Sequence, residues 1–289
     1  MNELPRIDML VPPEMAQKAE DLGVTKASMG WRTMFLLAIL AGAFIALGAV
    51  FATTVTAGAP GKLPFGIIKL FGGIVFCLGL VLVVTAGAEL FTGNNLIIMA
   101  LASRKITIMQ LLRSWTVVYI GNFVGSVMTA IFILITQQYM FGKGVVGMNV
   151  LEIANGKCNL GFVQAVALGM MCNALVCLAI WICLSGRTMT DKILATLFPI
   201  SAFVASGFEH CVANMYFISI GILVKMTAPL EFWKNIGKTT GDFASLTWGN
   251  FFIVNLFPVT IGNIIGGSVM VGLVYWFIYI RKAKISLFS

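Results

Sequence analysis

Charged residues are scarce in this chain: only 10% of its 289 residues are Asp, Glu, Lys or Arg. A soluble domain has about one quarter, so this composition excludes an ordinary soluble fold. The chain is instead 59% hydrophobic, with a mean hydropathy of +0.97. Several apolar stretches exceed the roughly 20 residues that a helix needs to cross a bilayer, and they lack the alternation of barrel strands. These features predict an all-α membrane protein.

Histidine, metal-site motifs and paired cysteines are also missing or rare. The chain has one histidine and six cysteines, and no two cysteines form a CxxC pair. No metal site or cofactor is therefore predicted, and the cysteines fit as small apolar side chains within the spans. HExxH and GxSxG motifs are absent, so nothing favours an enzyme. The net charge of +8 does not indicate nucleic acid, because the basic residues stand at the span ends.

Six membrane spans are predicted from the apolar stretches, at about residues 31–56, 69–102, 113–139, 160–184, 192–225 and 258–280. They form a channel domain over residues 31–281, which follows a polar N-terminal arm of residues 1–30 and precedes a tail of residues 282–289. Lys and Arg are more frequent on the side of the arm and the tail than on the opposite side. The positive-inside rule therefore places both termini in the cytoplasm.

One short motif occurs twice, inside the two longest spans. Residues 87–94 read Gly-Ala-Glu-Leu-Phe-Thr-Gly-Asn and residues 207–214 read Gly-Phe-Glu-His-Cys-Val-Ala-Asn, so both fit G-x-E-x-x-x-x-N. Spans of this length exceed one straight crossing at ~1.5 Å per residue, and Gly87 and Gly207 are natural points for a break. We therefore predict that helices two and five are both broken inside the membrane.

The two glutamates of this motif, Glu89 and Glu209, admit two interpretations. They are candidate proton carriers, because ionisable groups inside a membrane are usually functional. The alternative, which we favour, is structural: each carboxylate accepts backbone N–H groups at its helix break, as an N-cap residue does. A charged carboxylate facing a pore would also oppose an anionic substrate.

A second motif, I-G-N-x-x-G, is also repeated, at residues 120–125 and 261–266. The two motifs occur in the same order in each half, so a first repeat of residues 31–139 corresponds to a second of residues 160–281. Because three spans is an odd number, the second half enters the membrane from the opposite side, which predicts an inverted 3+3 repeat. The glycines of the second motif allow helices to approach closely.

Two helix breaks that meet near the bilayer midplane point to a pore or transporter. Unpaired backbone groups are tolerated there only when buried in protein or lining a wet cavity, and half-helix N-termini attract anions. His210, the one histidine, belongs to the residue type that ordinarily changes charge near neutral pH, so we interpret it as functional. Thr92 is expected either to face His210 or to bond its own backbone.

The chain resembles the formate–nitrite transporter family, and in particular its formate channel branch. The resemblance covers nearly the whole chain and rests on residues 63–66, 72–74, 87–92, 149–151, 203–210 with 213–215, and 258–267. The run from Phe203 to Met215, which begins Phe-Val-Ala-Ser-Gly-Phe-Glu-His, is very specific. Gly93 departs from the pattern, because relatives of this branch often have a small hydroxyl residue there.

The resemblance implies an aquaporin-like protomer with one pore, assembled into a homopentamer in the bacterial inner membrane. It implies a periplasmic constriction of Phe76, Leu80 and Phe203, and a cytoplasmic constriction of Leu90, Phe91 and Val176. Thr92 and His210 would face each other between them, with Asn173 and Asn263 nearby and Lys157 on the periplasmic side. The arm would contact the glycyl-radical enzyme pyruvate formate-lyase.

The function implied by the resemblance is transport of formate. Formate would cross as the neutral acid, with a proton relayed through His210 or taken from solvent. Nitrite or hydrosulfide is the alternative substrate within the same family. An ion-coupled secondary transporter of a small carboxylate is the alternative from another class, and Glu89 and Glu209 would then supply its coupling site.

Overall fold

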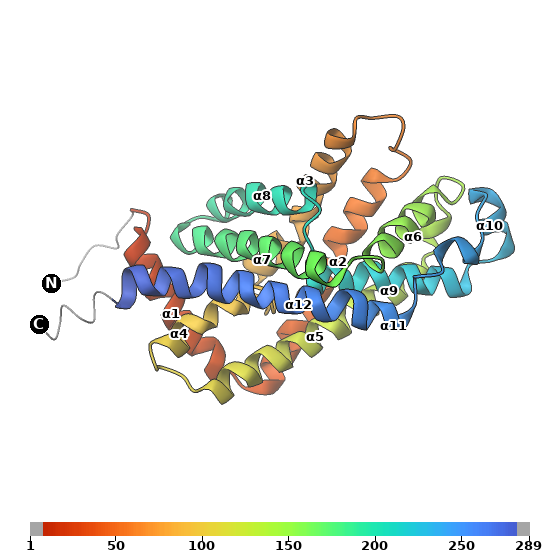
Figure 1. Cartoon of the computed structure of the whole chain (residues 1–289). Coiled ribbons are helices and arrows are strands. Elements are labelled where there is room, and N and C mark those ends of the chain that lie inside the picture. The colour runs from red at the N-terminus through yellow and green to blue at the C-terminus, as the bar shows by residue number, and fades with distance from the viewer. Residues whose placement is uncertain (1–7, 282–289) are drawn as a thin grey trace, which may run out of the picture.

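The computed structural model describes residues 8–281 and contains no strand within that range. Its α-helices are α1 (Pro12–Ser28), α2 (Trp31–Thr56), α3 (Phe65–Ala86), α4 (Ile98–Ala102), α5 (Ile108–Ile135), α6 (Val145–Lys157), α7 (Phe162–Ser185), α8 (Met189–Ala205), α9 (Cys211–Thr227), α10 (Leu230–Ile236), α11 (Trp248–Asn250) and α12 (Phe257–Ile264). Figure 1 shows the long helices packed side by side, with α1 against one end of the bundle. The predicted tail, residues 282–289, lies outside the described residues.

Five helical segments within residues 8–281 are long and apolar enough to cross a membrane: Trp31–Thr56, Phe65–Ala86, Ile108–Ile135, Phe162–Ser185 and Thr240–Arg281. The fifth predicted span, residues 192–225, is in two pieces, α8 and α9, of 17 residues each. Helix α9 passes the same test only together with α10, from which it is bent by 112°. The all-helical membrane architecture is therefore confirmed.

Both predicted helix breaks are present. Helix α3 ends at Ala86 and is capped by Gly87, which has φ = +78°, and α8 is followed by Gly207, which has φ = +72°. Glycine adopts this left-handed conformation without the steric cost that a Cβ would bring. The chain then runs without regular helix to a 3₁₀ turn at Gly93–Ile97 in the first case, and to α9 in the second.

The last span begins earlier than predicted. The predicted start at Pro258 is wrong, because helical structure extends from α11 to Arg281. Three stretches of it are π-helical: Phe251–Leu256, Ile265–Leu273 and Trp276–Arg281. Proline lacks an N–H and crowds the preceding turn of an α-helix, and the wider π-helical turns directly before α12 accommodate it.

The helix α6 was not predicted, because it is too short and too rich in glycine and asparagine to resemble a span. Its buried residues include Val150, Leu151 and Ala154, and Ala154 meets α9 so closely that a Cβ on Gly221 would overlap its own. This packing matters for the site, since α6 ends at Lys157.

The glycines of the repeated I-G-N-x-x-G motif lie at helix crossings. A Cβ on Gly125 would overlap the carbonyl oxygen of Ile39, which brings α5 against α2. A Cβ on Gly266 would overlap the carbonyl oxygen of Met170 in the same way, which brings the last span against α7. The expected close approach at these glycines is therefore present in both halves.

Candidate permeation path

The first helix break is held by Asn122 of α5. Its Oδ1 accepts a hydrogen bond from the backbone N–H of Phe91 at 2.9 Å, and its Nδ2 donates to the carbonyl oxygens of Glu89 and Ala38 at 2.9 and 2.8 Å. Asn122 is fully buried. Backbone groups freed by the break are thus paired by a side chain, as a break inside a membrane requires.

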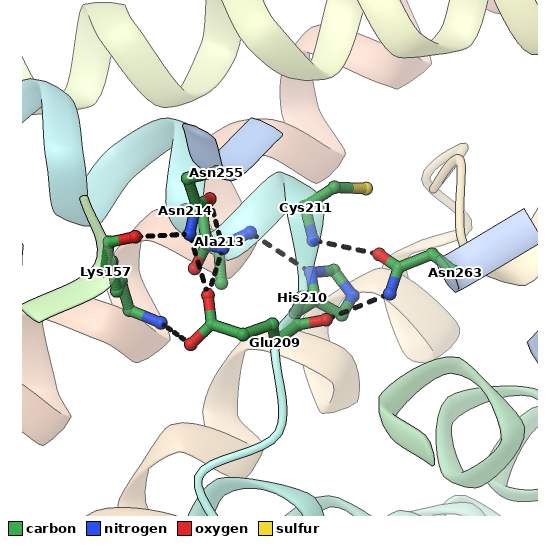
Figure 2. A network of polar contacts seen from close by, with 8 residues as sticks. All are labelled: Lys157, Glu209, His210, Cys211, Ala213, Asn214, Asn255 and Asn263. Carbon is green, nitrogen blue, oxygen red and sulfur yellow. Dashed lines mark hydrogen bonds and ion pairs between the residues drawn. The ribbon is translucent and has the colours of Figure 1, made fainter. Parts of the chain in front are cut away.

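The second break is held in the same way by Asn263 of α12. Its Oδ1 accepts from the backbone N–H of Cys211 at 2.9 Å, and its Nδ2 donates to the carbonyl oxygens of Glu209 and Gly169 at 2.9 and 2.8 Å; Figure 2 shows the bonds to Cys211 and Glu209. The side-chain oxygen of Asn263 and both N–H groups of its side-chain amide thus form hydrogen bonds with backbone groups. The predicted pore asparagine therefore braces the break, and its counterpart Asn122 was not singled out, although both stand in the I-G-N-x-x-G motif.

Glu89 is bound by side chains. Its Oε1 accepts from Lys26 Nζ at 2.8 Å and its Oε2 from Asn94 Nδ2 at 2.7 Å, while Lys26 Nζ also donates to Asn94 Oδ1 at 2.9 Å. The prediction that the Glu89 carboxylate accepts hydrogen bonds from backbone N–H groups is therefore wrong. The counter-ion, Lys26, comes from α1 in the N-terminal arm, far away in the sequence.

Glu209 has an equivalent set of partners, shown in Figure 2. Its Oε1 forms an ion pair of 2.7 Å with Lys157 Nζ, and its Oε2 accepts from Asn214 and Asn255 at 2.6 and 3.1 Å. The side chains of Lys157 and Glu209 are 16% and 7% exposed. The basic residue predicted at the pore is therefore neutralised by the glutamate, so Lys157 does not present a free charge.

Thr92 of the first break meets His210 of the second, with 3.0 Å between Thr92 Oγ1 and His210 Nε2. Both side chains are buried. The other ring nitrogen, Nδ1, accepts the backbone N–H of Ala213 at 3.0 Å, which makes His210 the N-cap of α9. Because Nδ1 accepts, a neutral ring has its proton on Nε2. We therefore assign Nε2–H as the donor to Thr92.

Two cavities approach this pair from opposite ends. The arm-side vestibule, about 400 Å³, is lined by α1 and the first break and reaches Glu89 and Leu90. The far-side vestibule, about 520 Å³, is lined by α6 and the second break and reaches Phe76, Phe203 and His210. The rings of Phe76 and Phe203 are 5.7 Å apart, edge to face, and Phe203 stacks on His210 at 5.9 Å.

The remaining predicted constriction residues line neither vestibule. Leu80 and Val176 are instead buried in the hydrophobic core. Phe91 packs edge to face on Tyr119 of α5, with 4.9 Å between ring centroids. Leu90 alone of the predicted cytoplasmic set borders the arm-side vestibule.

Asn173 of α7 joins the two halves. Its Nδ2 donates to Asn95 Oδ1 at 3.1 Å, next to the first break, and to the carbonyl oxygen of Asn263 at 2.7 Å. Like Asn263, it is engaged in bracing. Of the predicted site residues between the vestibules, Thr92 and His210 are therefore the two left to meet a substrate.

A family model described as formate/nitrite transporter matches residues 13–277. The chain belongs to the formate/nitrite transporter family. This confirms the resemblance seen in its motifs, and it makes the protein a member of a family of membrane transporters, not of enzymes.

Named relatives in this family are similar over most of their length. The chain is 47% identical to formate channel FocA of Escherichia coli (strain K12), over 95% of this chain and 96% of that one. It is 43% identical to formate channel FocA of Haemophilus influenzae, over 91% and 92%.

Two solved structures of the family have the same architecture. One, described as a pentameric formate channel with formate bound, has a TM-score of 0.83 and 48% identity, covering 87% of this chain and 98% of that chain. The other, an FNT family ion channel, has a TM-score of 0.77 and 27% identity, covering 92% and 98%.

Proposed function

We propose that this protein is a membrane channel for formate. The observation that carries the proposal is the buried Thr92–His210 hydrogen bond, which lies between two vestibules that open toward opposite ends of the bundle. A relative in a solved structure is a pentameric formate channel with formate bound. We extend that substrate and the homopentamer, with one pore per protomer, to this chain.

Desolvation determines the form in which formate crosses. A bare carboxylate loses several kcal/mol of hydration in a dry constriction, and Phe76 and Phe203 stand in front of His210 on the far side. The substrate therefore crosses as the neutral acid, with His210 Nε2–H and Thr92 Oγ1–H as the hydrogen-bond donors between the two vestibules. The two Glu–Lys pairs add no net charge that would repel it.

The capping bond of His210 bears on the source of the proton. A neutral ring whose proton is on Nε2 donates a hydrogen bond but has no proton to give away, and an imidazolium would also need a proton on Nδ1. That proton would break the bond from Ala213 N–H, which caps α9. We therefore propose that formate takes its proton from solvent in a vestibule, and that His210 acts as a hydrogen-bond donor instead of a relay.

The proposal includes the cellular setting. We place the pentamer in the bacterial inner membrane with both termini in the cytoplasm, which makes the arm-side vestibule cytoplasmic. The inverted orientation of the two repeats and a contact of the arm with pyruvate formate-lyase are parts of the same proposal. Nitrite and hydrosulfide are the competing substrates, because both are small and monovalent.

The decisive experiment compares His210→Asn with His210→Ala in liposomes, measuring formate uptake from pH 5 to 8. Asparagine keeps the N-cap of α9, whereas alanine removes both the cap and the ring. We expect wild-type uptake to rise as the pH falls. His210→Asn should slow uptake about tenfold, the effect of one hydrogen bond of ~1.4 kcal/mol, without changing the shape of the pH profile.

Two outcomes contradict parts of this proposal. A wild-type protein that takes up nitrite or hydrosulfide but not formate contradicts the substrate. A pH profile that flattens in His210→Asn contradicts the donor role and restores the relay. His210→Ala separates capping from chemistry, because its loss of thermal stability relative to His210→Asn measures the cap alone.

A further inference from the structure

The arm-side vestibule is lined by an excess of positive charge. Lys18 and Lys26 of α1 and Lys192 of α8 line it, together with one acidic residue, Glu89. Glu89 is already paired with Lys26. Among the described residues, neither Lys18 nor Lys192 forms an ion pair with a carboxylate.

Lys18 lies where α1 meets the corner between α7 and α8. Its Nζ donates a hydrogen bond of 2.9 Å to the carbonyl oxygen of Leu184, in the last turn of α7. Burial and the positive charges of Arg187 and Lys192 lower the pKa of Lys18. The ammonium group has three N–H donors, so two remain after the bond to Leu184.

Within residues 8–281, no ion pair joins a carboxylate to Lys18, Arg187 or Lys192. The ion pairs there join Lys26 with Glu89, Lys105 with Glu20 and Asp21, and Lys157 with Glu209. Asp191, the neighbour of Lys192, accepts the backbone N–H groups of Arg187 and Thr188 as a helix cap. Like charges held together without a counter-ion cost free energy, and an anion in the cavity removes that cost.

We propose that the arm-side vestibule contains a binding site for a small carboxylate anion between α1 and α8, held by Lys18 and Lys192. Lysine ammonium groups are compact point charges and suit a small anion better than the planar guanidinium group of arginine would. Because one lysine is on the arm and the other is on the bundle, the bound anion fastens α1 across the mouth. Naming formate as the anion rests on the proposed function; the site itself does not.

This arrangement couples anion concentration to the docking of the arm. A ligand that binds only the docked state stabilises it by RT ln(1 + [L]/Kd), so the population with a released arm falls by the factor 1 + [L]/Kd. At formate ten times above its Kd, release of α1 should become about elevenfold rarer. Substrate that accumulates on this side would thus hold the arm in place.

Hydrogen exchange of the α1 backbone amides tests the inference. The pentamer in zwitterionic lipid nanodiscs is compared in sodium formate, sodium chloride and sodium phosphate at one pH and matched ionic strength. We expect formate to slow exchange in Pro12–Ser28 about tenfold relative to chloride. Lys18→Met and Lys192→Met should lose this protection, and Lys62→Met, an exposed lysine outside both vestibules, should keep it.

The inference is overturned if formate protects α1 no better than chloride, if only phosphate protects it, or if both lysine variants respond as the wild type does. Size-exclusion profiles establish that each variant is pentameric, and Lys192→Arg, which keeps the charge, should retain most of the protection. Formate protection of α1 without formate uptake in liposomes would count against the channel proposal and leave this site standing.

Discussion

At the scale of single residues, the path is built from buried polar groups whose partners are other side chains. Glu209 is the clearest case, because Lys157, Asn214 and Asn255 together satisfy a carboxylate that is 7% exposed. A buried ion pair stabilises a protein little more than well-packed apolar side chains would. Removing one partner, however, leaves an uncompensated buried charge. The two members of such a pair should therefore be strongly coupled.

The coupling predicts a specific pattern of stability. Lys157→Met should destabilise the protein by about 3 kcal/mol or more, because Glu209 loses its counter-ion. Adding Glu209→Gln to Lys157→Met should recover most of that loss, since the glutamine has no charge to pair. Thermal unfolding of the purified protein measures both. Additive losses in the double variant would show that the ion pair is not the unit of stability.

Some residues of this network could be found in the sequence and others could not. The duplicated G-x-E-x-x-x-x-N contains Glu89, Asn94, Glu209 and Asn214, and all four lie in the two networks. Lys26 was missed because its arm is polar and no periodicity links it to a span 63 residues away. Gly93 is less special than its departure from the family suggests, because a Cβ there would meet Ile180 at an ordinary 3.6 Å.

At the scale of elements, α1 is fastened to the bundle along both sides. Lys18 bonds the end of α7, Lys26 bonds Glu89 at the first break, and Lys105 pairs with Glu20 and Asp21. Sequence patterns predicted the spans well, because continuous apolar stretches are strong signals. They did not predict α6 or the π-helical turns before Pro258, which depend on tertiary packing.

The pair of Glu20 and Lys105 gives docking of the arm a defined response to pH. Burial raises the pKa of Glu20, but hydrogen bonds with Lys105, Ser103 and Gln17 outweigh it, so the pKa lies below its ordinary 4.5. A carboxylate with a depressed pKa stabilises the docked state above the ordinary value and loses this effect as the pH falls through the docked pKa. Docking through Glu20 should thus be unchanged from pH 8 to 5 and weaken below about 4.5.

A spin label on Ser28→Cys measures this response through the mobility of α1. The six native cysteines are buried, so the label reacts selectively. Glu20→Gln should remove the loss of docking below pH 4.5, and Asp21→Asn, whose carboxylate is exposed, should retain it. A transition near pH 6 that persists in Glu20→Gln would show that another group controls the arm.

At the scale of the whole molecule, the two halves share a bracing scheme as well as motifs. Asn122 and Asn263 each form three hydrogen bonds to backbone around a break. We predict that Asn122→Leu and Asn263→Leu lower the unfolding temperature by similar amounts, because each leaves one N–H and one C=O of its break unpaired, at ~1–3 kcal/mol apiece. Differential scanning fluorimetry compares them, and a large effect in one half alone would contradict equivalent roles.

The shared bracing also fixes which residues correspond between the halves. Glu89 corresponds to Glu209 and Phe91 to Cys211, so Leu90 corresponds to His210. By the same step, Thr92 corresponds to Val212. A hypothetical protein made from two first halves would set leucine opposite threonine, and one made from two second halves would set histidine opposite valine. Neither protein would form the hydrogen bond between threonine and histidine. The braced breaks are thus compatible with two identical halves, whereas the Thr92–His210 bond requires that the halves differ.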